Sequence, residues 1–532
     1  MNILKKHIVV FEPTGLRILV DDQSTFLDAV RMIGLHLPAD CGGAGTCGKC
    51  ALLLDPSPEP KSEDVKHIEQ KELRKGVRLA CQHEVKVDTR AFLVSKRREM
   101  KILTEGDSRI KEWVPDLGNE GYYGIAIDLG TTTLVGYLLE LDSGTQIRQI
   151  ASLNPQVIIG EDVVSRITYA IQEQDGLIDL KERVTSEIDL MINSLLEESE
   201  INIEKLVRIS IVGNTVMQHL FLGADVEPLS LAPYEPSVRG AILTSGLEVG
   251  LISKNSEVYL PPNIAGYVGG DTVGFILSER LDLSNEIVLG IDVGTNGEIV
   301  LSNRGALSCC STAAGPAFEG ATIRHGMRGQ EGAIEHVVIH DPDNPPEITV
   351  IGDKPPRGIC GSAIVDIAAE MRLSGLIDNS GRIQTISSRV YDDNDFGRSY
   401  LLIDDEASSR QISFTQKDVR QVQLAKAAIN TGALILLQEA GLKIHDIDSV
   451  MLAGAFGSYI RPESALRIGL LPLIERDRII QVGNAAGEGA KALLISSKAR
   501  EIAQDFVSKI RYVELAAHDD FQSMFLESIP FH

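Results

Sequence analysis

Residues 122–139, YYGIAIDLGTTTLVGYLL, decide how most of this chain is interpreted, because they indicate a buried strand, a tight turn and a second strand. Residues 287–300, IVLGIDVGTNGEIV, repeat that order, with Asp292 placed 164 positions after Asp128. A long-range repeat of this kind predicts two copies of one α/β unit that face each other across a cleft.

The two Asp-x-Gly-Thr turns carry residue types that suit a phosphate group. Glycine lets the backbone approach the phosphate, while backbone N–H groups and threonine hydroxyls donate to its oxygens. The carboxylates of Asp128 and Asp292 are expected to hold Mg²⁺ through water or to orient an attacking water. One such turn often serves geometry alone, but two turns behind buried strands indicate a nucleotide site. The predicted phosphate-binding residues are Gly130, Thr131, Thr132, Thr133, Gly294, Thr295 and Asn296.

Three further polar residues near these turns have two readings each. Asp271 lies 21 positions before Asp292 and either orients water or Mg²⁺, or caps the start of a helix. Asp162 and Arg166 either line the cleft or form a surface ion pair. The sequence leaves both questions open.

Four cysteines in the first ninety residues form a second candidate site. Cys41, Cys47, Cys50 and Cys81 follow the spacing C-x5-C-x2-C-x30-C. An iron–sulfur cluster needs four converging thiolates, and glycines between them let the loop fold tightly and point N–H groups at sulfur. The glycines are Gly42, Gly43, Gly45 and Gly48. The alternative is a structural zinc site that uses His83, although zinc usually takes two short ligand pairs and only Cys47/Cys50 form one.

The residues around this loop predict a small mixed domain. Residues 6–20 indicate two strands around a turn at Pro13–Gly15, and Ser24 or Thr25 is expected to cap a helix that runs to about Leu35. Further strands are expected at 51–54 and 85–87. This order resembles the β-grasp fold of ferredoxins, and the spacing resembles adrenodoxin-like [2Fe–2S] proteins. The resemblance implies a [2Fe–2S] cluster on the four cysteines.

Composition excludes some classes of function. The chain has 532 residues and a net charge of −24, which argues against a general nucleic-acid or anionic-membrane binder. It contains no apolar run long enough to cross a membrane, and its N-terminus lacks the features of a signal peptide, so we expect a cytoplasmic protein. Seven cysteines argue against a disulfide framework. Cys309, Cys310 and Cys360 lie among small residues and are interpreted as buried thiols.

The predicted domain order is a β-grasp domain at 1–94, a linker at 95–121 and two subdomains at 122–286 and 287–532. The linker is basic at 96–101 and rich in polar and turn residues after that. We expect it to let the small domain move its cluster toward a partner.

The larger part resembles the superfamily of actin, heat-shock chaperone and sugar-kinase ATPases. The resemblance rests on the two phosphate turns and on 449–458, which resembles the adenosine motif with Gly454, Ala455 and Gly457 under the nucleoside. It implies a duplicated ribonuclease-H-like α/β fold that binds ATP. Residues 208–215 with the following helix, and the helix at 423–437, resemble the two connecting segments of that superfamily.

The whole chain resembles the reductive activators of corrinoid proteins, with residues 309–320 and 358–363 as supporting segments. The resemblance implies an ATP-dependent activase that passes an electron from its [2Fe–2S] cluster to a Co(II) corrinoid protein, which regenerates Co(I) for methyl transfer. It also implies Mg²⁺, an upstream electron donor such as a ferredoxin or flavoprotein, and a homodimer.

Three other functions stay open at this point. The first alternative is an acyl or sugar kinase with an appended redox domain. The second is an electron carrier whose ATPase half is a scaffold without turnover, and the third is an activator of the dehydratase or benzoyl-CoA type. The last class shares a [4Fe–4S] cluster between subunits, which four local cysteines make unnecessary.

Overall fold

The computed structural model describes residues 5–35, 37, 39, 41, 43–93, 113–294, 296–405 and 410–531. These residues fall into two compact units, each built from two separate stretches of chain. Residues 1–99 join 319–421 in the first unit, and 100–318 join 422–532 in the second. Most of the predicted linker, 95–112, lies outside the described residues.

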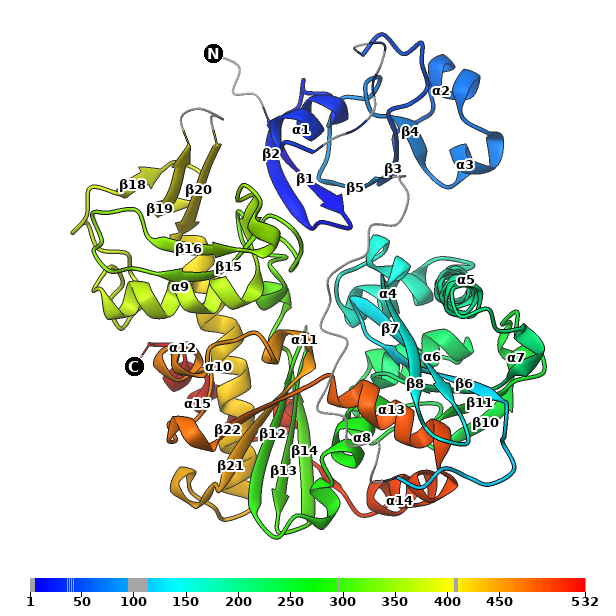
Figure 1. Cartoon of the computed structure of the whole chain (residues 1–532). Helices are drawn as coiled ribbons and strands as arrows, with labels where there is room; N and C mark the ends of the chain where they lie inside the picture. The colour runs from blue at the N-terminus through cyan, green and yellow to red at the C-terminus, as the bar shows by residue number, and fades with distance from the viewer. Residues whose placement is uncertain are drawn as a thin grey trace. The chain divides into compact units, whose positions relative to one another are not determined.

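A five-stranded sheet with three short helices forms the N-terminal part of the first unit (Figure 1). The strand order is β2-β1-β5-β3-β4, with β1 and β5 parallel and the other neighbours antiparallel. The elements are β1 Lys6–Glu12, β2 Leu16–Asp21, α1 Phe26–Met32, β3 Ala51–Asp55, α2 Ser62–His67, α3 Gln70–Arg74, β4 Val77–Leu79 and β5 Thr89–Leu93. This is the predicted β-grasp arrangement.

Local sequence explains where these elements begin. Thr25 accepts a hydrogen bond from the Asp28 N–H, and the Asp28 carboxylate accepts one from the Thr25 N–H, so a reciprocal cap starts α1 as predicted. Phe26, Leu27 and Val30 on its inner face are buried in the domain core. The strand expected at 85–87 is wrong. The last strand is instead β5, because Thr89–Leu93 pairs with both β1 and β3, whereas Val87 is exposed.

The second stretch of the first unit holds two small sheets and a helix. The sheet β16-β15-β17 packs against α9, and β18-β19-β20 forms a separate antiparallel meander (Figure 1). The elements are β15 Ala333–Val338, β16 Glu347–Val350, η7 Ile351–Asp353, β17 Gly358–Ile359, α9 Gly361–Leu373, β18 Val390–Asp393, β19 Gly397–Asp405 and β20 Arg410–Thr415. Helix α10, Gln416–Glu439, begins here.

A buried charge joins the two stretches of the first unit. Glu12, at the end of β1, is fully buried and accepts hydrogen bonds from the guanidinium groups of Arg328 and Arg90. Burial alone would raise the pKa of Glu12, but the arginines, Arg328 above all, hold it below its usual value. Beside this pair, the Arg328 N–H donates to the Thr14 carbonyl at 3.0 Å. The β1–β2 turn is thereby fixed to the segment around Arg328.

The first sheet of the second unit carries the first phosphate turn. Its order is β10-β11-β9-β6-β7-β8, with β6 parallel to β9 and antiparallel to β7. The elements are β6 Tyr123–Leu129, β7 Thr133–Glu140, β8 Gln146–Leu153, η2 Pro155–Ile158, α4 Val163–Gln172, α5 Gly176–Glu197, η3 Ile203–Lys205, β9 Leu206–Val212, α6 Thr215–Leu222, η4 Glu227–Ser230, β10 Ile242–Ser245, α7 Gly246–Val249, β11 Glu257–Leu260, α8 Gly270–Ser278 and η5 Leu281–Leu283.

The second sheet repeats this plan. Its order is β22-β21-β12-β13-β14-β23, with β12 parallel to β21 and antiparallel to β13, so the core strands match one for one. The elements are β12 Ile287–Val293, β13 Gly297–Asn303, β14 Ala306–Thr312, η6 Pro316–Glu319, η8 Ile444–Asp446, β21 Ser449–Ala453, α11 Gly454–Gly457, α12 Pro462–Ile468, η9 Arg476–Arg478, β22 Ile479–Gly483, α13 Ala485–Ile495, α14 Ser497–Val507, β23 Arg511–Tyr512, η10 Leu515–Ala517 and α15 Phe521–Ser528. The predicted duplication and fold class are confirmed.

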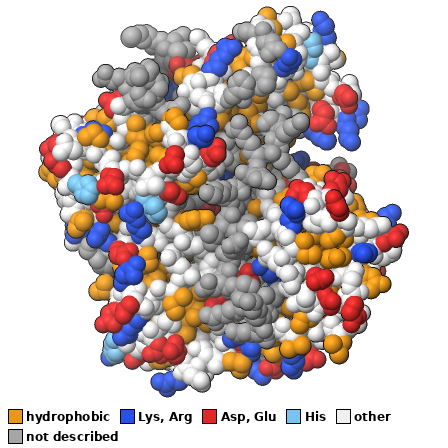
Figure 2. Space-filling model, viewed as in Figure 1, with side chains coloured by type: hydrophobic (Ala, Val, Ile, Leu, Met, Phe, Trp, Pro, Cys, Tyr) orange, Lys and Arg blue, Asp and Glu red, His pale blue; other side chains and the backbone are white. Residues whose placement is uncertain are grey.

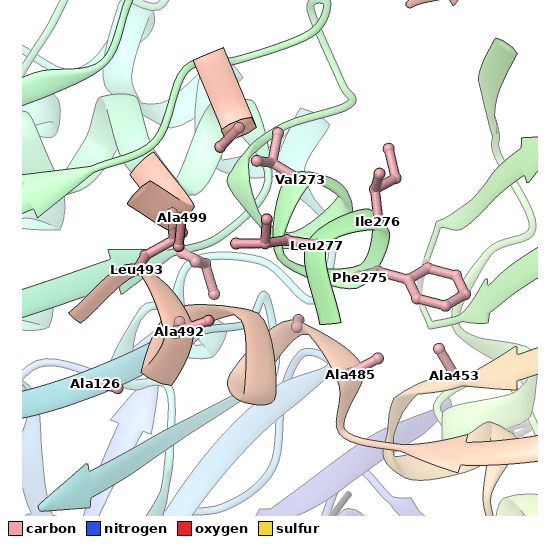
Figure 3. Close-up of a cluster of buried hydrophobic side chains, with 14 of the residues drawn as sticks. Ala126, Val273, Phe275, Ile276, Leu277, Ala453, Ala485, Ala492, Leu493 and Ala499 are labelled. Atoms are coloured by element: carbon pink, nitrogen blue, oxygen red, sulfur yellow. The ribbon is translucent and has the colours of Figure 1, made fainter. Parts of the chain in front are cut away.

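One hydrophobic core is shared by the two sheets of the second unit. It combines Ala126 of β6 and Ala453 of β21 with side chains of α8, α13 and α14 (Figure 3). Helices α8 and α13 pack so closely that a Cβ on Gly489 would lie 2.2 Å from the Gly274 Cα. These two helices therefore hold the sheets together.

The predicted connecting segments are wrong in both places. Helix α6, which follows 208–215, packs into a different core with α4 and α5. Helix α10, predicted at 423–437, packs on the second sheet at Gly432, where an added Cβ would meet Thr312 and Ile299. An apolar helix after a strand looks alike in sequence whether it covers one sheet or joins two.

Candidate functional site

The first phosphate turn follows β6 directly. Asp128 is the next-to-last residue of that strand, and the Gly130 N–H donates to the Thr133 carbonyl at 3.1 Å to close the turn. A Cβ on Gly130 would lie 2.5 Å from the same carbonyl oxygen, so the tight turn requires glycine. Thr132 lies inside the turn, and its carbonyl accepts from the Asn154 N–H at 2.8 Å.

Arg166 supports this turn from inside the protein. Its side chain is fully buried and donates to the Thr131 carbonyl at 2.6 Å and to the Gly160 carbonyl at 3.0 Å. Asp162 instead caps α4 and accepts from the Ser165 N–H at 2.8 Å. The surface ion pair considered for Asp162 and Arg166 is therefore wrong, because a buried arginine that serves backbone carbonyls is a structural support.

The second phosphate turn has the same form. Asp292 is the next-to-last residue of β12, and the Gly294 N–H donates to the Asn296 carbonyl at 3.1 Å to close the turn. Thr295 lies outside the described residues. Glu298 pairs directly with Asp292 across the β12–β13 ladder and is almost completely buried. This carboxylate was missed by the sequence analysis.

The adenosine motif approaches the second phosphate turn. Residue Ala453 pairs with Asp292 in the parallel ladder of β21 and β12, and α11 starts immediately afterwards at Gly454. Gln481 fixes the far end of α11 by donating to the Gly457 carbonyl at 2.9 Å. Ala455 lies within α11. The predicted motif residues thus follow a strand that borders the Asp292 strand.

Four carboxylates gather where the two turns meet. Burial raises the pKa of Asp128 to about 7; the hydrogen bond from Asn484 opposes the rise and the charge of Asp271 adds to it. Burial, with the charges of Asp271 and Asp128, raises the pKa of Asp292 to about 7. Burial and the charges of Asp271 and Asp292 raise the pKa of Glu298 well above its usual value. Carboxylate oxygens are ligands that Mg²⁺ prefers, and since no three of these described side chains converge on one point, they would hold the ion through water.

Asp271 belongs to this group and does not cap a helix. The cap position of α8 is Gly269, and Asp271 is the second residue of the helix. Its carboxylate accepts from the Thr272 N–H at 2.7 Å. Burial raises the pKa of Asp271 to about 6. The helix-cap reading is wrong, and the structure brings Asp271 together with Asp128 and Asp292.

The cysteine loop presents its thiols in two pairs. The Sγ atoms of Cys41 and Cys47 lie 3.3 Å apart, and the Cys50 thiol interacts with Cys81. Backbone N–H groups of Gly43, Cys47 and Thr46 lower the pKa of Cys41 to about 5. Two thiol pairs with N–H donors aimed at sulfur fit a cluster in which each of two irons takes two thiolates.

Glycine is required at two positions of that loop. Gly45 has φ +75°, and an added Cβ would lie 2.6 Å from the Gln82 amide nitrogen. Gly48 has φ +69°, and its Cβ would lie 2.9 Å from the Cβ of His67. Left-handed backbone and close packing together exclude larger residues. Gly42 lies outside the described residues.

His83 does not join the thiols. Its Nε2 lies 2.6 Å from the buried Asp64 carboxylate, which also accepts from the N–H groups of Leu79 and Lys61. Burial favours a raised pKa at Asp64, but these donors outweigh it and hold the pKa below its usual value. The His83 imidazole is therefore bound to the Asp64 carboxylate in the core of the domain and is not a ligand beside Cys81. Among the described residues, no three His, Cys, Asp or Glu side chains converge as a single metal ion requires.

The remaining cysteines are buried thiols, as expected. Cys309 and Cys310 lie on β14, and Cys360 precedes α9. Burial raises the pKa of all three. A thiol that stays protonated is a poor metal ligand.

The surface shows charges of both signs. On the face drawn in Figure 2, acidic and basic side chains are interspersed with apolar ones. Among the described residues, no helix is both long and apolar enough to span a membrane.

Comparison with known proteins adds family information to this geometry. A family model described as a 2Fe-2S iron-sulfur cluster binding domain matches residues 9–86. A second, described as the RACo middle region, matches 123–284, and a third, the C-terminal domain of RACo, the ASKHA domain, matches 286–532.

Three related proteins are similar over most of their length. The corrinoid activation enzyme RamQ of Eubacterium limosum is 32% identical and covers 98% of this chain and 99% of its own length. The [Co(II) methylated amine-specific corrinoid protein] reductase of Methanosarcina barkeri is 24% identical, with 76% of each chain covered. A solved structure of a reductive activator for a corrinoid, iron–sulfur protein superposes with a TM-score of 0.71 at 29% identity, covering 99% of this chain and 98% of its own.

Proposed function

Since the chain belongs to the RACo family, we propose that it is an ATP-dependent reductive activator of a corrinoid protein. The observation that carries the proposal is similarity to a corrinoid activation enzyme over 98% of the chain, so that the cysteine loop and both phosphate turns are included. A ferredoxin alone or an ATPase alone would match only one half.

The cysteine loop is proposed to hold the electron that is transferred. Cys41, Cys47, Cys50 and Cys81 are the ligands, and a bound [2Fe–2S] cluster supplies one electron at a time. Backbone N–H groups around Cys41 stabilise negative charge on sulfur. The electron passes to Co(II) of the partner's corrinoid, which becomes Co(I), and an upstream ferredoxin or flavoprotein replaces it.

The paired turns are proposed to bind ATP. Gly130, Thr131 and the N–H groups of the first turn face one end of the phosphate chain, and the Asp292 turn faces the other. Asp128, Asp292 and Asp271 hold Mg²⁺ through water or orient the attacking water. Gly454 and Gly457 in α11 lie under the nucleoside.

ATP is needed because the electron transfer is uphill. On a one-electron scale each ~59 mV costs about 1.4 kcal/mol. A nucleotide helps only through states that bind the partner differently. We propose that docking raises the cobalt potential and that ATP binding or hydrolysis then releases the reduced partner.

To test the proposal, the reduced protein is mixed anaerobically with a Co(II) corrinoid protein. The absorption spectrum of the cobalt is recorded with ATP, without ATP and with a non-hydrolysable ATP analogue. Repeated Co(I) formation only with ATP is the expected result. Equal turnover with and without nucleotide would refute the coupling. Reduced cluster without any cobalt reduction would favour the kinase or the scaffold function instead.

Further parts of the proposal concern the organisation of the chain. We propose a cluster domain at 1–94 and ATPase subdomains at 122–286 and 287–532, supported by the family matches that end and begin near these positions. A homodimer is proposed as well, and light scattering after size-exclusion chromatography tests it.

A further inference from the structure

Three asparagines around the first phosphate turn share one geometry. Asn154, Asn214 and Asn484 are the capping residues of η2, α6 and α13, and each is at least nine-tenths buried. In each, Oδ1 accepts a backbone N–H of the helix it caps, at 2.9 Å in all three cases. The donors are Gln156, Met217 and Gly487.

The cap fixes which way each amide group faces. An asparagine amide accepts only through oxygen and donates only through nitrogen, so a capping Oδ1 forces Nδ2 to the other side. Asn154 Nδ2 donates to the Gly130 carbonyl at 2.9 Å, and Asn214 Nδ2 donates to Thr131 Oγ1 at 3.0 Å. Asn484 Nδ2 donates to Asp128 Oδ2 at 2.9 Å. All three donors therefore meet the four residues from Asp128 to Thr131.

The donor from Asn214 determines where the Thr131 proton lies. A hydroxyl has one hydrogen, and an oxygen that accepts from Nδ2 keeps that hydrogen for another partner. With its carbonyl held by Arg166 and its hydroxyl oxygen by Asn214, Thr131 has its hydrogen left for a phosphate oxygen.

The donor from Asn484 acts on Asp128 in a related way. An Asp128 oxygen that accepts from Nδ2 is fixed as an acceptor, and the hydrogen bond holds the carboxylate in one orientation. The second amide hydrogen of Asn484 goes to the Tyr137 hydroxyl at 3.1 Å. The Tyr137 ring in turn lies 4.2 Å from Lys491 Nζ, and Lys491 pairs with Glu488 at 2.5 Å. The amide is thus anchored on both sides.

We propose that Asn154, Asn214 and Asn484 are positioning residues of the first phosphate turn, and that Asn214 and Asn484 fix the donor and acceptor roles of Thr131 and Asp128. The inference rests on the proposed nucleotide site. It extends that proposal to three residues that lie outside both Asp-x-Gly-Thr sequences. They contact the first of these sequences from η2, α6 and α13, Asn154 at a backbone carbonyl and Asn214 and Asn484 at side chains.

Asn→Asp substitutions separate this role from helix capping. Aspartate caps a helix as well as asparagine does, but an ionised carboxylate cannot donate. Asn214→Asp and Asn484→Asp are expected to weaken binding of an ATP analogue at least tenfold, measured by titration calorimetry on the full chain under conditions where thermal unfolding without nucleotide shows each variant to be folded. Asn484→Ser, which adds no charge beside Asp128, is measured in parallel and should show the same loss. The matched control is Asn202→Asp, at an exposed cap whose Oδ1 accepts from the Glu204 N–H at 2.9 Å, and it should bind like the unaltered protein.

A double-mutant cycle tests the action through Thr131. In a Thr131→Val background, Asn214→Asp should cost no more than about threefold further, because the hydroxyl on which it acts is gone. The same tenfold loss in both backgrounds, or full affinity in Asn214→Asp, would overturn the inference. If an aspartate variant fails to fold, Asn214→Ser and Asn484→Ser keep a capping oxygen without the reach, and the same loss is expected.

Failure of the inference can be told from failure of the proposed function. An unaltered protein that binds no adenine nucleotide would overturn both. An unaltered protein that binds tightly, with Asn214→Asp and Asn484→Asp equal to it, would overturn only the role of the asparagines.

Discussion

Gly454 lies directly against the Asp292 carboxylate: a Cβ on Gly454 would be 2.3 Å from Asp292 Oδ1, and the glycine backbone has φ +84°. The adenosine motif and the second phosphate turn therefore touch through a residue that has no side chain. Any substitution there moves either the carboxylate or the start of α11.

Gly454→Ala is expected to weaken ATP-analogue binding at least tenfold, because the added methyl group displaces Asp292. Titration of the full chain with the analogue measures this. Gly441→Ala is the matched control, since Gly441 has φ +68° but open space around its Cβ position. It should carry the same backbone penalty, roughly 1 kcal/mol, with unchanged binding. Equal loss in both variants would contradict the steric explanation.

Cys81→Ser is expected to abolish cluster assembly, whereas Cys360→Ser should leave it intact. The first removes one of the paired thiols in the glycine loop, and the second removes a buried thiol that burial keeps protonated. Iron and acid-labile sulfide content, with the electron paramagnetic resonance signal of the reduced protein, distinguish them. Full cluster content in Cys81→Ser would refute the ligand assignment.

Glu12→Gln is expected to destabilise the first unit by about 3–5 kcal/mol, because it leaves two partly buried arginines without the buried counter-charge between them. The same pair makes the unit sensitive to acid. A carboxyl whose folded pKa is depressed stabilises the fold above its unfolded pKa and loses that contribution as pH falls through the folded value. Denaturant unfolding from pH 7 downward measures both effects.

The control for Glu12 is Asp395→Asn, which breaks the exposed Lys6–Asp395 pair of the same unit. An exposed pair contributes little, so its stability should change by less than about 1 kcal/mol. A similar loss in both variants would show that burial of Glu12 is not the cause.

Lys426→Met is expected to change how stability depends on alkaline pH. Lys426 is buried, with Nζ 2.5 Å from the Pro530 carbonyl, and burial lowers its pKa from 10.5 to about 8. The charged amine costs stability at neutral pH. As pH rises from 8 toward 10.5 the folded chain loses this proton first, so the unaltered protein gains stability relative to Lys426→Met, by up to ~1.4 kcal/mol per pH unit.

Unfolding of both proteins at pH 7.5 and 9.5 measures that gain. Lys498→Met serves as the control, because Lys498 is exposed and its pairing with Glu501 is a surface contact. A constant difference between Lys426→Met and the unaltered protein at both pH values would contradict the expected titration.

Sequence patterns predicted those parts of the fold that depend on local order. The repeated strand–turn–strand around Asp128 and Asp292 predicted the duplicated sheets. The order of strands and helix around the cysteine loop, which resembles that of ferredoxins, predicted the β-grasp domain. The roles of 208–215 and 423–437 were predicted wrongly, since the partner of an apolar helix is decided by tertiary packing that no local pattern carries.

The site was only partly accessible from sequence for a similar reason. Asn214 and Asn484 follow strands from other parts of the chain, and only the recurring Val-Gly-Asn at 212–214 and 482–484 marks them. Glu298 lies six positions after Asp292. It was not predicted as a site residue because the register of the β12–β13 hairpin, which pairs it with Asp292, could not be read from the sequence. Asp271 was found by its distance in sequence from the second turn, but the sequence did not show that it lies near both Asp128 and Asp292.

The buried pair of Glu12 and Arg328 bears on how freely evolution or an engineer can exchange the electron-carrying part. Removal of residues 1–94 would leave Arg328 without Glu12, and Met327, Ala333 and Cys360 without Leu16, their partner in a small apolar cluster. The β-grasp domain therefore cannot be exchanged for another domain without loss of these contacts. A foreign ferredoxin grafted in its place would have to bring an acidic residue to the same turn, and lineages that replaced this domain should carry matching changes at Arg328.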